Sequence, residues 1–286
     1  MKFSEIYSSK KSVLSFEFFP PKKQEKLGKT KDKIKELSKL CPDFVTVTYG
    51  AGGSTRGFTK DLVSYASKEI KIPAVAHLTC VSHTKEDIDQ ILDELKASGI
   101  SHILALRGDP PKGKTSFETT EGGFSCARDL VKHIKSRNDF SIAVAGYPEG
   151  HLEAESKEQD LLYLKEKVDA GAEVIFTQLF FNVDLYLDFC RRAKEIGINV
   201  PIVPGILPIA SKSQVEKFTS LCGASIPEEL SKQLSSIKED DVISFGVEYA
   251  IEMCRKLLDN GAPGLHIYTL NKWRQTGPIV ESLNLL

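Results

Sequence analysis

Short apolar runs recur along the chain and are separated by longer amphipathic stretches. Eight of these runs are rich in β-branched and aromatic residues, which is typical of strands in a parallel sheet that is covered on both faces. They are VLSFEFF (13–19), FVTVTYG (44–50), AVAHLTC (74–80), HILALRG (102–108), SIAVAGY (141–147), EVIFTQLF (173–180), VPIVPGI (200–206) and GLHIYTL (264–270).

The stretches between these runs have helical periodicity. In residues 160–172, for example, Leu161, Leu164 and Val168 recur at about one-turn spacing. Glycine readily takes the left-handed conformation at a helix C-terminus. Four glycines stand between a predicted helix and the following strand, namely Gly99, Gly171, Gly197 and Gly261.

Eight strands that alternate with helices predict an α/β fold, a (β/α)8 TIM barrel. An open, doubly wound sheet is the alternative, because periodicity does not show whether a sheet closes. The chain has no linker, repeat or break in composition, so residues 1–286 are expected to form a single domain. Residues 109–124 and 222–241 are predicted to be the longer non-helical connections.

Composition narrows the classes of partner. The 286 residues are 41% hydrophobic and 27% charged with a formal net charge of −1, which gives no general attraction to nucleic acid or anionic membranes. The first residues do not resemble a signal peptide, and no apolar stretch approaches the roughly 20 residues that span a bilayer. Six scattered cysteines without a C-x-x-C motif predict buried free thiols. A cytoplasmic protein is expected.

Most predicted strands carry a polar residue near their C-terminal end, where a barrel of this kind places its chemistry. Each has a structural explanation too: Glu17 could form a salt bridge, His77 could be a core residue, and Arg107 could pair with Asp109. Because these polar residues all fall at the same end of the predicted barrel, a functional site is favoured over separate structural roles. The residues are Glu17, Thr46, Thr48, His77, Arg107, Asp109, Tyr147, Glu149, Gln178 and Tyr268.

Glu17 has the most unusual sequence environment, because Phe16, Phe18 and Phe19 flank it. A carboxyl group among phenylalanine side chains is poorly solvated, which favours its protonated form. That setting suits a general acid, so Glu17 is predicted to donate a proton in catalysis.

Residues 108–115 match the phosphate-binding pattern G-x-x-x-x-G-K-[ST]. A P-loop works through successive backbone N–H groups followed directly by a helix, and Pro110 and Pro111 have no N–H to offer. Residues 116–123 do not have a helical pattern, so the match is interpreted as a coincidence. The glycine-rich residues 49–57 miss the dinucleotide-binding spacing, and no metal-ligand cluster is apparent.

The chain carries a series of longer motifs: SFEFFPPK (15–22), FVTVTYGAGGSTR (44–56), HLTC (77–80), LRGDPP (106–111), GYPEGH (146–151), DLLYLKEKVDAGA (160–172), TQLFF (177–181), PGILPI (204–209) and HIYTLN (266–271). Together, and in this order, they resemble the methylenetetrahydrofolate reductases, flavoenzymes of folate metabolism. The resemblance covers almost the whole chain. It is to the bacterial type, which has the catalytic domain only.

The resemblance implies a barrel with non-covalent FAD, reduced by NADH or NADPH, that reduces 5,10-methylenetetrahydrofolate to 5-methyltetrahydrofolate for methionine synthesis. It also implies that Glu17 is the general acid and that Asp109 stabilises the cationic substrate intermediate. The positions that match substrate contacts are Glu17, Asp109, Gln178, Gln214, Phe218, Tyr268 and Lys272. Those that match FAD contacts are Thr48, Tyr49, Ala51, His77, Arg107, Gly108, Asp109, Ala127, Tyr147, His151, Ala154, Asp160 and Lys167. A homo-oligomer is expected.

Three departures from the family pattern stand out. Tyr163 and Glu166 replace an Asn and an Arg that many relatives carry on the same helix, so the adenosine end of FAD is expected to be held differently. Lys272 replaces a common Arg and loses its bidentate capacity. The chain stops at Leu286, so a C-terminal domain that senses S-adenosylmethionine is not expected.

Three other functions remain open. One is a folate or corrinoid methyl-transferring barrel without flavin, the second a P-loop nucleotide triphosphatase. The third is a non-catalytic barrel subunit of an electron-transfer complex. The first predicts a colourless protein, the second magnesium-dependent ATP turnover, and the third FAD binding without oxidation of NADH or NADPH.

Overall fold

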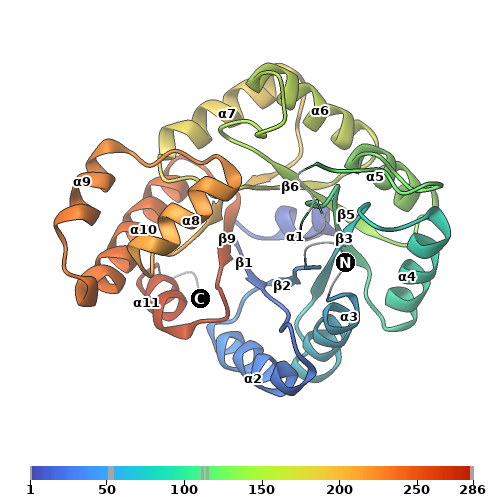
Figure 1. Ribbon diagram of the computed structural model, residues 1–286, viewed down its shortest axis with the longest axis horizontal. Coiled ribbons are helices and arrows are strands. Elements are labelled where there is room, and N and C mark those ends of the chain that lie inside the picture. Colours follow the sequence, from blue (N-terminus) through green and yellow to red (C-terminus); the bar gives the residue numbers. More distant parts are fainter. Residues whose placement is uncertain (1, 51–54, 111–112, 114–115, 284–286) are drawn as a thin grey trace.

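Parallel strands form the centre of the molecule and helices surround them as a ring (Figure 1). The computed structural model describes residues 2–50, 55–110, 113 and 116–283. Every neighbouring pair of strands is parallel, and the order in the sheet is β7-β6-β5-β4-β3-β2-β1-β9-β8. The strands are β1 (Val13–Phe18), β2 (Phe44–Val47), β3 (Ala74–Thr79), β4 (His102–Leu106), β5 (Ser141–Gly146), β6 (Val174–Thr177), β7 (Ile202–Val203), β8 (Gly205–Ile206) and β9 (Gly264–Tyr268).

The sheet comes round to a nearly closed barrel at Pro204. This residue alone separates β7, which pairs with β6, from β8, which pairs with β9. Proline has no N–H for the ladder, so the predicted strand 200–206 is split in two. The carbonyl of Pro204 still accepts a hydrogen bond of 3.0 Å from the N–H of His266. The predicted (β/α)8 barrel is therefore confirmed, and the open doubly wound sheet is wrong.

Helices cover the outside of the barrel. They are α2 (Leu27–Leu37), α3 (Arg56–Tyr65), α4 (Lys85–Ala97), α5 (Ala127–Ser136), α6 (Lys157–Asp169), α7 (Val183–Glu195), α8 (Lys212–Cys222), α10 (Val242–Asp259) and α11 (Trp273–Ser282). The four glycines predicted to follow helices have φ between +81° and +125°, as that position requires. At the N-terminal ends, the side chains of Thr84, Ser156, Asn182 and Ser211 accept backbone hydrogen bonds from the first turn.

Two helices were not expected from the sequence. Helix α1 (Phe3–Ser9) places Phe3 inside the barrel, where its ring meets Phe44 and Phe176 edge to face. The N–H of Phe3 donates a hydrogen bond of 2.9 Å to the Ser141 hydroxyl, which ties α1 to β5. Within residues 222–241, predicted to be non-helical, the structure has α9 (Glu228–Ser236). Leu230 and Leu234 bury one side of this helix, and that short repeat was too brief to be recognised in the sequence.

The barrel interior has an apolar floor and a polar upper part. Val13, Phe44 and Val75 belong to one buried cluster inside the barrel. Because side chains alternate along a strand, the residues two and four positions later also point inward and approach the C-terminal end. On β1 this places Glu17 above the apolar floor.

The cysteines are all free, and they differ in how far they are buried. Cys80 and Cys254 are buried, as predicted, whereas Cys41 is exposed. Across residues 2–50, 55–110 and 116–283, no helix is both long and apolar enough to cross a membrane.

Candidate active site

A cavity of about 490 Å³ opens at the C-terminal ends of the strands. Its volume lies within the range usual for small-molecule and cofactor sites. Many of the predicted site residues line this cavity, although they come from nearly every part of the chain. They are Glu17, Thr48, Tyr49, His77, Arg107, Gly108, Asp109, Tyr147, His151, Gln178, Phe218 and Tyr268.

Glu17 lies in the cavity wall between two histidines. Its Oε2 atom is 3.5 Å from the Nε2 atoms of both His77 and His266. Glu17 is only 6% exposed, and the two imidazoles are buried as well. Burial lowers the pKa of His77 to about 4, while the nearby Glu17 opposes this shift. His77 is therefore uncharged at neutral pH and does not balance a negative charge on Glu17.

His266 is a site residue that sequence reasoning missed. Its Nδ1 atom is 2.8 Å from the hydroxyl of Ser15, and its ring stacks on Phe176 at a centroid distance of 4.6 Å. The Nε2 atoms of His266 and His77 have no hydrogen-bond partner among the described residues. The alternation of side chains along β9 could have identified His266 from the sequence, because it is two residues before Tyr268 and so faces the same side.

Tyr147 and His151 form the wall nearest to α6. Their rings meet edge to face with centroids 4.8 Å apart. Behind them, the Lys167 ammonium group donates a hydrogen bond of 2.7 Å to the Ala145 carbonyl and lies 5.9 Å from the Tyr147 ring centroid. Burial lowers the pKa of Lys167 to about 8, and burial raises the pKa of Asp160. The two charges partly offset each other.

Arg107 follows β4 at the mouth of the cavity. It does not pair with Asp109, the structural alternative considered above. Its guanidinium group forms a two-pronged ion pair with Glu153, one contact of which is 3.0 Å, and packs over Phe117. Asp109 is exposed at the rim. Gly108 has a φ of +92°, and a Cβ there would lie 2.8 Å from a Val81 methyl carbon, so only glycine fits.

The P-loop interpretation has no support in the described part of this loop. Residues 111–112 and 114–115 lie outside the described residues. Among residues 116–126 the structure has no helix, and α5 begins only at Ala127. A P-loop requires a helix directly after its Lys-Thr pair.

Thr48 and Tyr49 follow β2, and two hydroxyl groups hold their backbone. Thr59 donates a hydrogen bond of 2.8 Å to the Thr48 carbonyl, and Thr55 donates one of 2.8 Å to the Tyr49 carbonyl. Ala51, a predicted FAD contact, lies outside the described residues. The phenol of Tyr49 is 3.0 Å from Nε2 of His83, a buried residue that the sequence did not single out.

Gln178 and Tyr268 lie close to the seam of the barrel. The Tyr268 hydroxyl donates a hydrogen bond of 2.6 Å to the Thr177 carbonyl. A Cβ on Gly205 would collide with that carbonyl and lie 2.6 Å from the Tyr268 hydroxyl oxygen. The Gln178 side-chain oxygen accepts a hydrogen bond from the N–H of Leu179, and Gln178 lines the cavity.

Helix α8 forms the outer wall through Phe218 and Leu221, and Leu221 is 65% exposed. Gln214, a predicted substrate contact on the same helix, is not part of the cavity lining. Its carboxamide accepts a hydrogen bond from the N–H of Ala210 and donates one to the Pro208 carbonyl. It therefore ties α8 to the loop before it.

Five other predicted contacts are also absent from the lining, namely Ala127, Ala154, Asp160, Lys167 and Lys272. Ala127 is the first residue of α5, and the N–H of Ala154 bonds to the His151 carbonyl at 3.0 Å. Lys272 precedes α11, and its N–H bonds to the Thr269 carbonyl at 2.9 Å.

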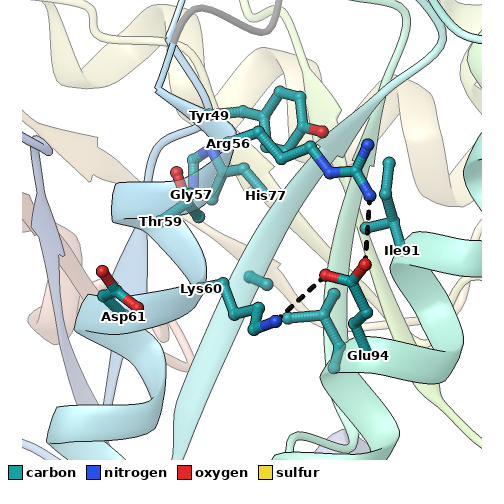
Figure 2. A pocket seen from close by; sticks show the side chains of 11 residues that line it. Tyr49, Arg56, Gly57, Thr59, Lys60, Asp61, His77, Ile91 and Glu94 are labelled. Carbon is teal, nitrogen blue, oxygen red and sulfur yellow. Dashed lines mark hydrogen bonds and ion pairs between the residues drawn. The ribbon is translucent and has the colours of Figure 1, made fainter.

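A second cavity, of about 360 Å³, lies outside the barrel between α3 and α4 (Figure 2). Figure 2 shows Arg56 and Lys60 of α3 both directed at Glu94 of α4. The contacts are 3.5 Å and 3.0 Å, so these cations are already engaged. Tyr49 lines both cavities and forms part of the wall between them.

Comparison with known proteins decides the family. The family model described as methylenetetrahydrofolate reductase matches residues 2–284. The chain belongs to the methylenetetrahydrofolate reductase family. It is 42% identical over 298 aligned residues to methylenetetrahydrofolate reductase (NADH) 1 of Arabidopsis thaliana, an alignment that covers 100% of this chain and 50% of that protein. It is 37% identical to a probable methylenetetrahydrofolate reductase (NADPH) of Caenorhabditis elegans, covering 99% of this chain and 44% of that protein.

The chain thus spans about half the length of the curated reductases that it matches. Among solved structures, an uncharacterized protein from Clostridium thermocellum that binds two copies of 5-methyl-5,6,7,8-tetrahydrofolic acid has a TM-score of 0.68 at 17% identity, covering 98% of this chain and 97% of that one. A 2,3-dimethylmalate lyase has a TM-score of 0.53 at 10% identity, covering 98% and 80%. Since one fold carries such different chemistries, the fold likeness by itself assigns no reaction to this methylenetetrahydrofolate reductase relative.

Proposed function

We propose that this chain reduces 5,10-methylenetetrahydrofolate to 5-methyltetrahydrofolate with NADH or NADPH, using bound FAD. The observation that carries the proposal is the buried carboxyl group of Glu17 at the end of the barrel where this fold places its chemistry. Family membership supports the reaction class, and the names of the relatives include both nicotinamide donors. The solved relative that binds 5-methyl-5,6,7,8-tetrahydrofolic acid supports a folate in a barrel of this shape. We also propose that the chain is one catalytic domain.

The described residues fit a flavin. The cavity combines apolar walls with polar atoms that lack protein partners, because Thr79 Oγ1 and His77 Nε2 are buried and unbonded among the described residues. Arg107 and His151 at its outer end, with Lys167 behind them, suit a diphosphate. When bound, FAD would take hydride from the nicotinamide and pass it to the folate in a ping-pong cycle.

Glu17 is proposed to hold and deliver the proton that this chemistry needs. The imidazolidine ring of the folate must open to an iminium cation before its one-carbon unit accepts hydride. Opening is favoured when the departing nitrogen is protonated, and the Glu17 carboxyl group faces the cavity with low exposure to water. His77, uncharged at neutral pH, leaves Glu17 to supply the proton.

Other cavity residues are proposed to orient the folate. Asp109, at the rim, would stabilise the cationic intermediate electrostatically. The Gln178 NH₂ group would bind the pterin, and Phe218 and Tyr268 would pack against the substrate. Burial raises the pKa of Tyr268 well above its ordinary value, so its phenol stays neutral and acts as a donor. Gln214 and Lys272 are proposed to act at the edge of the site.

A visible spectrum of the purified protein tests the proposal. We expect flavin absorbance that bleaches on anaerobic addition of NADH or NADPH and returns on addition of 5,10-methylenetetrahydrofolate. A protein that stays colourless after incubation with FAD would contradict the proposal and favour a flavin-free methyl-transferring barrel. Bleaching without recovery by the folate would contradict the assigned substrate.

A further inference from the structure

Ser15 and His266 form a buried polar pair next to Glu17. The strands β1 and β9 are neighbours in the barrel (Figure 1), and their register sets Ser15 beside His266. The Ser15 Oγ atom is 2.8 Å from Nδ1 of His266, and both residues are fully buried. Because side chains two apart on a strand share a face, Ser15 and Glu17 both point into the barrel. Ser15 therefore contacts the histidine that contacts Glu17.

The ring of His266 is held on several sides. It stacks on Phe176 with centroids 4.6 Å apart and meets the Tyr268 ring edge to face at 5.4 Å. With Nδ1 at Ser15, the opposite nitrogen, Nε2, is 3.5 Å from Oε2 of Glu17. His77 approaches Glu17 at the same distance, but no hydrogen bond within the described part of the chain anchors its ring. Of the two histidines, His266 is the one with a fixed orientation.

The tautomer of His266 decides what faces Glu17. A neutral imidazole carries its hydrogen on one nitrogen and a lone pair on the other. The Ser15 hydroxyl donates a hydrogen bond of 3.4 Å to the Leu265 carbonyl. A hydroxyl has a single hydrogen, so with that donation Ser15 Oγ accepts from an N–H at Nδ1 of His266. The lone pair of His266 is then on Nε2 and faces Glu17.

A lone pair at Nε2 favours the protonated form of Glu17. It accepts a hydrogen bond from a carboxylic acid after a small rotation of the carboxyl group, and it repels a carboxylate. The other titratable groups that face Glu17 are His77 and Tyr268. Burial lowers the pKa of His77 to about 4 and raises the pKa of Tyr268 well above its ordinary value, so both are uncharged at neutral pH. On β2, the residue paired with Glu17 is Thr46, which does not titrate.

We propose that Ser15 and His266 are positioning residues that keep Glu17 in its proton-donating form. Ser15 holds the hydrogen of His266 on Nδ1, and the free Nε2 accepts the hydrogen bond of the Glu17 acid. This inference rests on the function proposed above. His266 stays neutral and neither gives nor takes a proton. The proton that reaches the folate nitrogen leaves Glu17, and water in the cavity replaces it.

The imidazole nitrogen chemical shifts of the ligand-free protein, measured by NMR, test the arrangement without any reaction. The spectrum of His266→Gln identifies the signals of His266. We expect the wild type to show the tautomer with hydrogen on Nδ1, and Ser15→Ala to shift His266 toward the tautomer with hydrogen on Nε2. Hydrogen on Nε2 in the wild type would overturn the proposal. An unchanged tautomer in Ser15→Ala would remove Ser15 from it.

Stopped-flow kinetics of the two half-reactions test the consequence. Ser15→Ala should slow folate reduction by about threefold to tenfold, the effect of one net hydrogen bond, and leave flavin reduction by NADH within about twofold of the wild type. The deficit should grow as the pH is raised, because the variant holds the proton on Glu17 less well. A deficit that does not change with pH, or an equal loss in both half-reactions, would refute the positioning role.

Thr276→Val is the matched control. Thr276 of α11 is fully buried, and its hydroxyl has no partner among the residues that the structure describes. This variant should match the wild type in both half-reactions, and a loss equal to that of Ser15→Ala would show a general effect of removing a buried hydroxyl and refute the proposal. A wild type that shows the expected tautomer but does not reduce the folate would refute the proposed function and leave the arrangement around Glu17 supported.

Discussion

The Oε2 atom of Glu17 lies 3.5 Å from the Nε2 atom of His266, and both side chains are buried. The two residues come from opposite ends of the chain and meet because β1 and β9 are hydrogen-bonded neighbours in the barrel. The Glu17 carboxyl group is shielded from bulk water and lines the cavity.

Glu17→Gln should separate the two half-reactions. Glutamine keeps the shape of the side chain but has no acidic proton, so ring opening of the folate should slow by roughly a hundredfold to ten-thousandfold. Flavin reduction by NADH needs no proton from this position and should stay within about twofold of the wild type. Stopped-flow absorbance measures both steps. Equal loss in the two half-reactions would contradict the role of Glu17 as the acid.

Asp109→Asn should impair the folate step through electrostatics. Asparagine is nearly the same size but cannot stabilise a cation, so the rate of folate reduction should fall by roughly a hundredfold. Asp109 is exposed at the rim, so the melting temperature should not change. Single-turnover kinetics with the reduced enzyme give the rate. An unchanged rate would remove Asp109 from the catalytic groups.

His77 should make the ligand-free protein sensitive to acid. Its pKa is lowered from 6.5 to about 4, mainly by burial, so the unfolded chain binds a proton more readily than the folded one between these values. Stability from this group is complete above pH 6.5 and is lost as the pH falls toward 4. The contribution of His77 to the free energy of unfolding that is lost over this pH range is on the order of 3 kcal/mol.

Urea unfolding of the wild type and His77→Gln at several pH values in this window measures the effect. The free energy of unfolding of the variant should decline less steeply below pH 6.5. Parallel curves for the two proteins would contradict the depressed pKa of His77.

Gly205→Ala should disturb the seam of the barrel. The added Cβ would collide with the Thr177 carbonyl and lie 2.6 Å from the Tyr268 hydroxyl oxygen. We expect a loss of about 2 kcal/mol in the free energy of unfolding, because neither the Thr177 backbone nor the partly buried Tyr268 ring can move freely. Displacement of Tyr268 should also raise the KM for the folate. Chemical unfolding and steady-state kinetics test both effects.

Gly28→Ala is the matched control for Gly205→Ala. Gly28 lies in α2, and a Cβ there would have no atom within 4 Å. Alanine favours the helix, so this variant should gain about 0.5 kcal/mol. If both variants lose stability equally, steric crowding at Gly205 is not the cause.

The order and type of most elements could be predicted from the chain because their signals are local. Apolar β-branched runs predicted the strands, and glycines at positions such as Gly99 predicted where helices end. Helix α1 and helix α9 were missed because each buries only two hydrophobic residues, too few to establish a period. The break at Pro204 was present in the sequence, but only pairing with two different neighbours makes it the seam of the barrel.

By itself, the sequence determined the alternation of strands and helices, the strand ends that carry polar residues, and the carboxyl group of Glu17 that phenylalanines flank. These follow from periodicity and from the chemistry of adjacent residues. Only the tertiary structure decided that the sheet closes at Pro204, that Glu17 meets two histidines, and that Arg107 pairs with Glu153 rather than Asp109. Such partners lie far apart in the sequence, and their contacts depend on strand register and helix rotation, which local patterns do not specify.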